Sequence, residues 1–497
     1  MTKIKKLWKH FSDIKKLGYT ANLLHWDMQT YMPEGSNEGR SELLALIEEI
    51  SHNKLISKKT KDLIKNAEKV KDLDLIDSTM LREAKRDYEK AVKVPTELVV
   101  KISRAQTIGH KAWVKSREKR DFSIFLPHLE KMIKLKEEYA DKLDLGETRY
   151  DTLLDDYEPG VSSKWIADVF DDLKSELIKI LDKLMSSSDK PDQSILKENY
   201  NPSKQWDFGL EVIKKFNFDF KHGRQDKAVH PFTTSLSSTD TRITTRISED
   251  FLSPALFGTI HECGHALYDM GFMKEIHNTI LANGASMGIH ESQSRMYENF
   301  IGRGKEFWDY WYPTLQKYFP ENLKDYQKDE FYRSINTVIP SLIRVEADEV
   351  TYSLHIILRF ELERQIFEGE VDPKELPDLW NAKSEELLTV LPPNDSLGLL
   401  QDVHWSEGYF GYFPTYALGN LYCAQIYEDA LEKHPNLPEQ YSKGEFSTIL
   451  EYLRENVHQY GRIYQPRELI QKISGKELDA KYFVKYLKDK FYPIYGV

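Results

Sequence analysis

The stretch Thr259-Ile260-His261-Glu262-Cys263-Gly264-His265 contains the pattern His-Glu-x-x-His. On a helix, two histidines four residues apart lie on one face, about one turn apart. Both imidazoles can then bind one tetrahedral metal ion, which keeps positions for a third protein ligand and a water. Glu262 can accept a proton from that water as it attacks a carbonyl carbon. The stretch therefore predicts a catalytic metal site with His261 and His265 as ligands and Glu262 as general base.

The flanking residues predict a helix of about 17 residues around this motif. Ser253 and Pro254 are typical of an N-cap followed by the first helical residue, and Gly271 is typical of a stop. Apolar side chains recur between them at helical spacing, at Leu256, Phe257, Ile260, Leu267 and Met270. Cys263 lies off the histidine face, and we expect a small buried residue there. The alternative is a core helix whose histidines bind backbone carbonyls.

A second segment, Ile289-His290-Glu291-Ser292-Gln293-Ser294-Arg295, lies in a helix-like run from about 286 to 301. Glu291 is the expected third ligand, because two histidines and one carboxylate form a common catalytic zinc set. His290 is a rival, but it points about 100° away from Glu291, so only one of the two can face the metal. His277, in the polar connection 274–284, is a second rival.

Threonine-rich runs at 230–236 and 240–247 flank Ser237-Ser238-Thr239 and predict a small β-hairpin before the motif helix. An extended peptide can lie along the edge of such a hairpin, held by main-chain hydrogen bonds. The alternative is a structural hairpin with a surface arginine.

Most of the remaining chain has helical periodicity. Two apolar helix faces are Trp165, Val169, Leu173, Leu177 and Ile180, and Leu126, Leu129, Ile133 and Leu135. The polar segment 186–192 predicts a loop. We expect one domain over 1–497, with an N-terminal helical half (1–190) and a half that carries the metal site (191–497).

Composition excludes some classes of protein. The net charge of −11 argues against a nucleic-acid partner. The two cysteines, Cys263 and Cys423, suggest no disulfide framework. Segment 1–19 is lysine-rich and amphipathic and lacks the apolar core of a signal peptide. No run of 18 apolar residues predicts a membrane span. We therefore expect a soluble cytoplasmic protein without a membrane partner.

Further motifs occur in order along the chain. They are Leu24-His25-Trp26-Asp27-Met28-Gln29-Thr30-Tyr31-Met32-Pro33, His230-Pro231-Phe232, Asp240-Thr241-Arg242-Ile243-Thr244, Ile343-Arg344-Val345-Glu346-Ala347-Asp348 and Gly398-Leu399-Leu400-Gln401-Asp402-Val403-His404-Trp405. With the histidine motif and the Glu291 segment, they make the chain resemble the carboxypeptidase Taq family of zinc metallocarboxypeptidases through most of its length.

The resemblance implies a mostly α-helical, saddle-shaped, neurolysin-like fold with a deep central groove and a small β-hairpin near the zinc site. It implies release of single C-terminal amino acids, with broad specificity, from peptides with a free C-terminal carboxylate. It also implies one Zn²⁺ per chain, with Co²⁺ as the other metal, and a homodimer.

The segment 407–414 resembles the Tyr-x-x-Tyr region of the wider group. By that match Tyr412 stabilises the oxyanion opposite the metal, while Tyr409 and His404 contact substrate. Tyr409 stays open as the alternative to Tyr412, and both tyrosines could simply pack in the core.

Recognition of a free carboxylate calls for an arginine, whose fork binds a carboxylate bidentately. Arg344 and Arg242 are the candidates, and the motif matches add His230 and Asp240 as substrate-binding residues. The alternative for Arg344 is a surface position or an ion pair with Glu346 or Asp348.

Two other functions remain open. An oligoendopeptidase of the same fold would carry Gly-x-His after the second zinc histidine, where this chain has Ala266-Leu267-Tyr268. A non-catalytic helical metal-binding interaction protein would be expected to lack Glu262 or a ligand, and all four residues are present.

Overall fold

The motif helix α10 (Ser253–Asp269) has the predicted length of 17 residues in the computed structural model, which describes residues 2–497. Its start differs by one residue from the prediction. Ser253 is the first helical residue and Leu252 occupies the N-cap position, where its aliphatic side chain accepts no hydrogen bond. Leu256, Ile260 and Cys263 are buried, so the helix is anchored in the core by the face opposite its histidines.

Helix α11 (Met287–Arg295) carries Glu291 and continues into a π-helix, Met296–Gly302. The Ser286 side chain caps its start by accepting the Ile289 N–H at 3.0 Å. α11 packs against α10 and along α17 (Pro414–Lys433). At Gly264 a Cβ would lie 2.5 Å from the carbonyl oxygen of Gln293, so glycine allows the two motif helices to approach closely.

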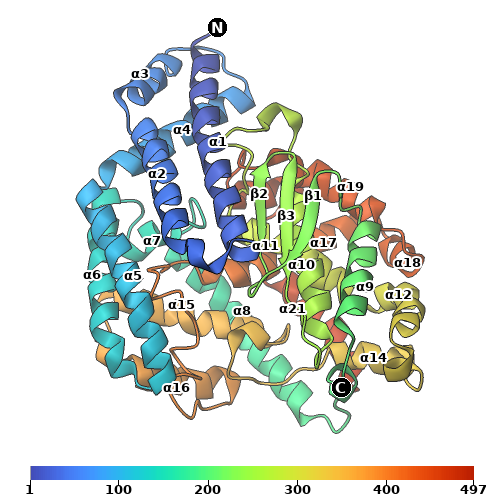
Figure 1. The fold of residues 1–497 in the computed structure, drawn as a ribbon. Helices are drawn as coiled ribbons and strands as arrows, with labels where there is room; N and C mark the ends of the chain where they lie inside the picture. The colour runs from blue at the N-terminus through green and yellow to red at the C-terminus, as the bar shows by residue number, and fades with distance from the viewer. Residues whose placement is uncertain (1) are drawn as a thin grey trace.

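The predicted hairpin is present in a three-stranded sheet of order β1-β3-β2, from β1 (Gly223–Lys227), β2 (Thr233–Ser237) and β3 (Asp240–Thr245). β2 and β3 pair antiparallel, and β1 pairs parallel with β3. Helix α1 (Lys3–Thr30) runs beside β2 (Figure 1), and Asn22 Nδ2 donates to the Ser235 carbonyl at 3.0 Å. The sheet therefore lies between α1 and α10.

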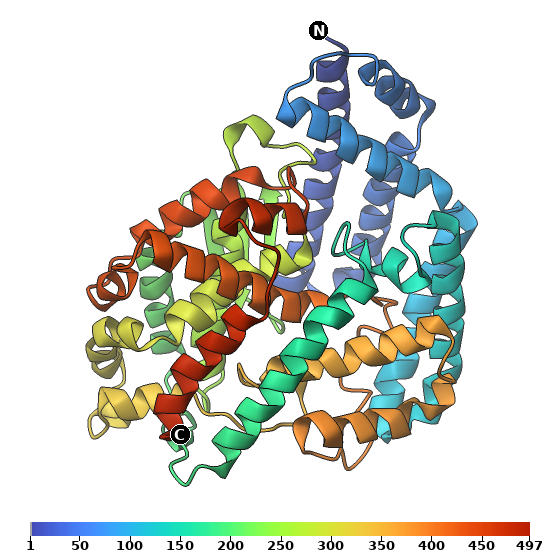
Figure 2. The same cartoon turned by 180° about the vertical axis from the view of Figure 1, so that it is seen from behind.

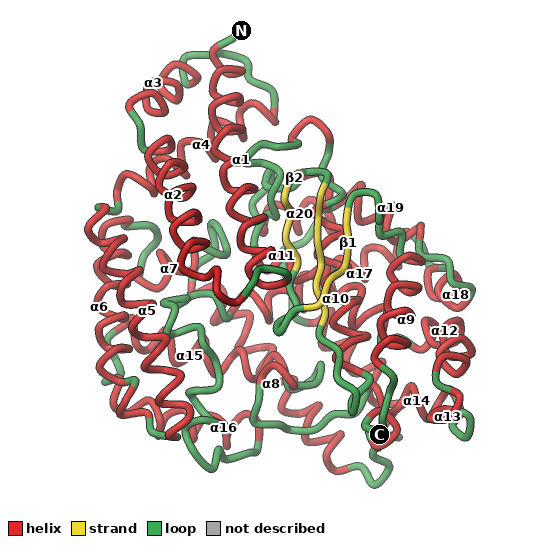
Figure 3. Tube along the Cα trace, in the orientation of Figure 1, coloured by secondary structure: helices red, strands yellow, loops and turns green. Residues whose placement is uncertain are grey.

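Helices make up most of the molecule around this sheet (Figure 3). Between α1 and the sheet, the chain forms the helices α2 Asn37–Leu55, α3 Lys58–Ala67, α4 Leu75–Lys93, α5 Thr96–Lys119, α6 Leu126–Leu143, α7 Arg149–Leu154, α8 Ser163–Ser186 and α9 Pro202–Lys215. Those after α11 are α12 Lys305–Tyr318, α13 Pro320–Leu323, α14 Lys328–Ile335, α15 Tyr352–Glu368, α16 Leu376–Leu388, α17, α18 Leu437–Ser442, α19 Ser447–Asn456, α20 Pro466–Ser474 and α21 Lys481–Tyr495.

Helices from distant parts of the chain pack on each other at the back of the molecule. Figure 2 shows α8 crossing that side between α21 and the α15–α16 pair, and α8 contacts both α21 and α15. One buried apolar cluster extends from Ile4 to Tyr495. The periodic apolar faces predicted within 126–135 and 165–180 lie on α6 and α8, where most of their residues are buried. The mostly helical fold with a small sheet is thus confirmed.

The predicted loop at 186–192 follows the end of α8. The division of the domain into halves at this loop stays a prediction. Among the described residues, no helix combines the length and the apolar character that a membrane span requires.

Candidate metal centre

His261, His265 and Glu291 offer ligand atoms that all lie within 4.8 Å of one another. Glu291 Oε2 is 3.7 Å from His261 Nε2 and 3.5 Å from His265 Nε2. Ligand atoms bound at about 2.0–2.2 Å to a tetrahedral zinc ion lie about 3.3–3.6 Å apart. The donor set and its spacing therefore fit one zinc ion.

The Nδ1 atoms of His261 and His265 have hydrogen-bonding partners, so their Nε2 atoms are free to bind a metal. Glu298 Oε2 lies 2.8 Å from His261 Nδ1 and accepts its proton. His290 Nδ1 lies 2.7 Å from His265 Nδ1, and His290 Nε2 lies 3.1 Å from Asp269 Oδ1. The Asp269 carboxylate can accept a proton from His290 Nε2, an arrangement that leaves His290 Nδ1 to accept the Nδ1 proton of His265.

Glu291 is held with one oxygen turned toward the histidines. Arg295 Nε donates to Oε1 at 2.7 Å, and the Ser294 hydroxyl lies 3.2 Å from Oε2. The Arg295 guanidinium also donates to Glu298 at 3.1 Å, so one partly buried cation joins both carboxylates. Helix α17 covers Glu291 from the other side, where Gly419 lies against its side chain.

Glu262 is 6 % exposed and lies on the helix beside the first histidine. The Thr233 hydroxyl, on strand β2, donates to its Oε2 at 2.6 Å. Burial raises the pKa of Glu262 above its ordinary value, and the neighbouring His261 acts in the opposite direction. A carboxylate held in this way can accept a proton from a water bound between the three ligand atoms.

The tyrosines and His404 of the predicted substrate region form one aromatic cluster. The Tyr412 ring lies 5.6 Å from the His404 ring and 5.2 Å from the Tyr416 ring. His404 Nε2 is 3.4 Å from the Tyr416 hydroxyl. Tyr409 is 44 % exposed, with its ring 6.4 Å from that of Tyr412. Burial raises the pKa of Tyr412 to about 12, so its hydroxyl stays a proton donor at neutral pH.

Arg344 is buried and pairs with Asp402, which excludes the alternative of a surface position or an ion pair with Glu346 or Asp348. Its Nε and Nη2 atoms donate to Asp402 Oδ1 at 3.0 and 2.9 Å, and Nη1 donates to Tyr352 at 3.2 Å. Arg359, fully buried, donates to the other oxygen of Asp402 at 2.7 Å. Two guanidiniums thus share one carboxylate.

The neighbouring histidines do not change this charge balance. Burial lowers the pKa of His404 and of His355 to about 3, so both are neutral at pH 7. The cluster of Arg344, Arg359 and Asp402 therefore carries a net charge of +1.

Asp240, Arg242 and His230 lie around the sheet. Arg242 donates through Nε and Nη2 to Asp240 at 3.1 and 3.0 Å. Its guanidinium stacks 4.2 Å from the ring centre of Trp26 on α1, which ties the hairpin to that helix. His230 is exposed and precedes β2.

The rival ligands have other partners. His290 supports His265, as described above, and His277 Nε2 lies 2.9 Å from the Phe272 carbonyl oxygen. The sequence reasoning missed Glu298, Asp269 and Thr233 as supports of the centre. Glu298 could have been found, because it lies seven residues after Glu291 on the same helical run.

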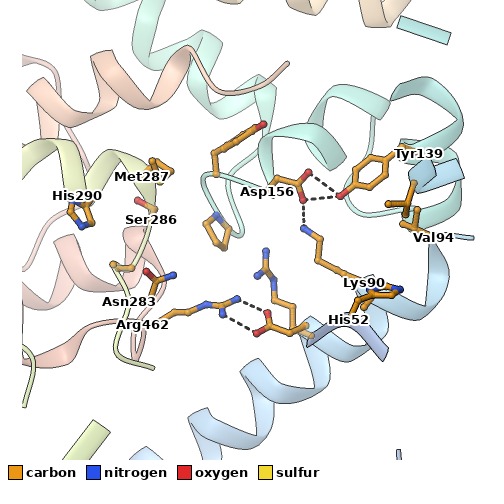
Figure 4. A pocket seen from close by; sticks show the side chains of 18 residues that line it. His52, Lys90, Val94, Tyr139, Asp156, Asn283, Ser286, Met287, His290 and Arg462 are labelled. Carbon is orange, nitrogen blue, oxygen red and sulfur yellow. Dashed lines mark hydrogen bonds and ion pairs between the residues drawn. The ribbon is translucent and has the colours of Figure 1, made fainter. Parts of the chain in front are cut away.

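A cavity of about 500 Å³ lies beside the centre (Figure 4). One wall consists of segment 283–287 and His290, and α4 contributes the opposite wall with side chains such as Lys90. Tyr157 also lines the cavity, and its ring meets the Tyr412 ring edge-on at 5.0 Å. The cavity therefore borders His290, which contacts His265, and Tyr157, which contacts the aromatic cluster, while none of the three candidate ligands lines it.

Comparison with known proteins shows the family of the chain. Residues 6–491 match the family model of the carboxypeptidase Taq (M32) metallopeptidases. The chain is 40 % identical to carboxypeptidase 1 of Bacillus subtilis over 98 % of both chains. It is 38 % identical to thermostable carboxypeptidase 1 of Thermus thermophilus over 97 % of both. The crystal structure of an M32 carboxypeptidase from Deinococcus radiodurans superposes with a TM-score of 0.97 at 36 % identity, covering 100 % of both chains. The chain therefore belongs to the carboxypeptidase Taq (M32) family of metallopeptidases and is a peptide-bond hydrolase.

Proposed function

We propose that the protein is a zinc-dependent carboxypeptidase that releases single amino acids, with broad specificity, from peptides with a free C-terminal carboxylate. The observation that carries this proposal is the convergence of His261 Nε2, His265 Nε2 and Glu291 Oε2 beside the buried carboxylate of Glu262. We further propose one metal ion per chain, with cobalt as the alternative to zinc, and a homodimer.

A bound zinc ion would supply a polarised water of lowered pKa to this site. Glu262 accepts the proton of the attacking water and passes it to the leaving amine, a role that typically contributes 10² to 10⁴ in rate. Thr233 orients Glu262 through the 2.6 Å hydrogen bond to Oε2. The Tyr412 hydroxyl donates to the oxyanion that develops on the carbonyl oxygen, and His404 and Tyr409 contact the peptide.

Arg344 is the favoured receptor of the substrate carboxylate. The cluster that it forms with Arg359 and Asp402 has one carboxylate for two guanidiniums, so a further anion is electrostatically favourable there. Arg242 is the alternative, since it belongs to the hairpin with His230 and Asp240. Its own pairing with Asp240 and its stacking on Trp26 weigh against that role.

The upstream residues of the peptide are proposed to occupy the cavity of about 500 Å³. Two contacts support this direction of binding. Tyr412 contacts Tyr157, which lines the cavity. Tyr412 also contacts Tyr416, whose ring centre lies 5.0 Å from the Arg344 guanidinium. A peptide whose carboxylate reaches Arg344 would thus extend past Tyr412 toward the cavity.

The assignment of base and ligand is tested by two variants. Glu262→Gln should abolish turnover and keep about one metal ion per chain, because it removes proton transfer but no ligand. Glu291→Ala should lose metal and activity together. Elemental analysis of the purified proteins, with peptide hydrolysis measured on the same samples, checks both. A metal-free Glu262→Gln protein would contradict the role of Glu262 as base.

A further inference from the structure

Helix α15 places a buried carboxylate, Glu363, behind the loop that carries the aromatic cluster. Glu363 is 0 % exposed and accepts three hydrogen bonds. Trp405 Nε1 donates to Oε1 at 2.8 Å, while the Gly411 N–H and the Tyr150 hydroxyl donate to Oε2 at 2.9 and 2.8 Å. Two of the three donors thus belong to one loop, 405–411.

The two loop donors stand next to residues of the proposed site. Trp405 directly follows His404, and Gly411 directly precedes Tyr412. Glu363 therefore holds both ends of the short segment between these two side chains. A hydrogen bond within the loop restrains it as well, since the Tyr409 N–H donates to the His404 carbonyl at 3.0 Å.

Gly411 leaves the loop little freedom to move. Its φ of +85° is left-handed, which favours glycine, and a Cβ there would lie 2.9 Å from backbone atoms of Leu153 and Leu154 in α7. The Gly411 backbone is therefore clamped between α7 and the Glu363 carboxylate. The direction in which the chain leaves Gly411 decides where the Tyr412 hydroxyl lies.

We propose that Glu363 is a positioning residue for Tyr412, holding the 405–411 loop so that the tyrosine hydroxyl meets the developing oxyanion. This inference rests on the proposed function, since it takes Tyr412 as the oxyanion donor. Glu363 itself touches no reacting atom. Its ionised form suits the role, because a carboxylate accepts all three bonds and donates none.

The surroundings support this assignment. Arg359, one turn earlier on α15, is bound to Asp402, so no cation pairs directly with Glu363 among the described residues. Burial raises the pKa of Glu363 to about 7, against the three hydrogen bonds, which lower it. A buried carboxylate that is stabilised mainly by loop donors is costly for packing alone. Its placement is explained if the loop geometry matters for catalysis.

The test is a double-mutant cycle between Glu363→Gln and Tyr412→Phe, measured by steady-state hydrolysis of a free-acid peptide with the metal-loaded enzyme. Glutamine keeps the size but turns an NH₂ group toward at least one of the three donors. We expect Glu363→Gln to lower kcat at least about tenfold, with KM changed less than about threefold, because small misplacement of a catalytic group can cost up to about 10²-fold. Metal content should stay unchanged.

The double-mutant cycle distinguishes a positioning role of Glu363 from an independent effect on kcat. Tyr412→Phe should lower kcat by about 10² to 10³, and adding Glu363→Gln to it should cost about twofold or less, because the two residues act as one unit. Additive losses would overturn the positioning role. A Tyr412→Phe enzyme with full kcat would instead refute the oxyanion assignment in the proposed function, and this inference with it.

Two further variants distinguish loss of positioning from a folding defect. Trp405→Phe removes one loop donor and keeps Glu363, so it should show a smaller loss of kcat and the same non-additivity with Tyr412→Phe. Tyr150→Phe is the matched control, because it removes the donor that comes from α7 and leaves both loop bonds. It should keep kcat within about twofold of the parent. A Tyr150→Phe loss equal to that of Glu363→Gln would overturn the proposal.

Discussion

Gly419 on α17 offers a direct test of how packing holds the third metal ligand. A Cβ at this position would lie 2.6 Å from Glu291 Cγ and 2.8 Å from Glu291 Cβ. Non-bonded carbon atoms are most stable at about 3.5–4.0 Å, so Gly419→Ala requires Glu291 or one of the helices to shift by roughly an ångström. The Cβ atom of Glu291 belongs to the rigid start of its side chain, so rotation of the carboxylate alone does not relieve the contact.

The cost of such overpacking is typically about 1–3 kcal/mol. Without metal, Glu291 can rotate away and relieve part of the strain, whereas metal binding requires it in place. The strain then raises the free energy of the metal-bound state relative to the metal-free state. This difference corresponds to about 5- to 150-fold weaker metal affinity. Competition with a chromophoric chelator measures the metal Kd of parent and variant.

Gly18→Ala is the matched control. Gly18 lies within helix α1, and a Cβ there meets no described atom within 4 Å, so metal affinity should not change. If Gly419→Ala binds metal within about twofold of the parent, the reasoning fails: either α17 does not restrain Glu291 or Glu291 is not a ligand.

Three further outcomes are expected. Burial raises the pKa of Glu158 to about 8 from 4.5, so the folded protein binds more protons than the unfolded chain between these values and its free energy of unfolding falls as pH rises through them. Glu158→Gln should remove this fall of up to about 1.4 kcal/mol per pH unit, as followed by urea unfolding across that range. His290→Ala should keep its metal when metal is in excess but bind it about 10- to 100-fold more weakly, since it removes the partner of His265; an unchanged chelator titration would contradict this. Asp402→Asn should destabilise the fold by about 3–5 kcal/mol, because it leaves two buried guanidiniums without a counter-charge; an unchanged midpoint of urea unfolding would contradict it.

The parts of the site that could be predicted from the sequence are those that depend on local periodicity. The spacing of His261 and His265, the length of α10 and the hairpin at 233–245 follow from patterns within a few residues. Glu291 was predicted from ligand chemistry, and the fold brings it to the histidines because α11 packs on α10.

The parts that could not be predicted depend on contacts between distant segments. Asp402 lies 58 residues from Arg344 in the chain, and no local rule pairs them. An ion pair with Asp348 was sterically available to Arg344 as an alternative, but Asp348 Oδ1 accepts the backbone N–H groups of Val350 and Thr351 at 2.9 and 3.0 Å. Strand β1 was missed for another reason. Its sequence Gly-Arg-Gln-Asp-Lys lacks β-branched and aromatic residues, and it is a strand because it pairs with β3.

The most direct test of the central claim is a timed digest of one peptide in two forms, a free C-terminal acid and a C-terminal amide, read by mass spectrometry with and without a chelator. The free acid should give a ladder of products, each one residue shorter, and the chelator should stop it. The amide should react at least about tenfold more slowly, because a charge-assisted contact contributes roughly 1.5–3 kcal/mol. Internal fragments formed at equal rates from both peptides, or cleavage that the chelator leaves unchanged, would contradict the account.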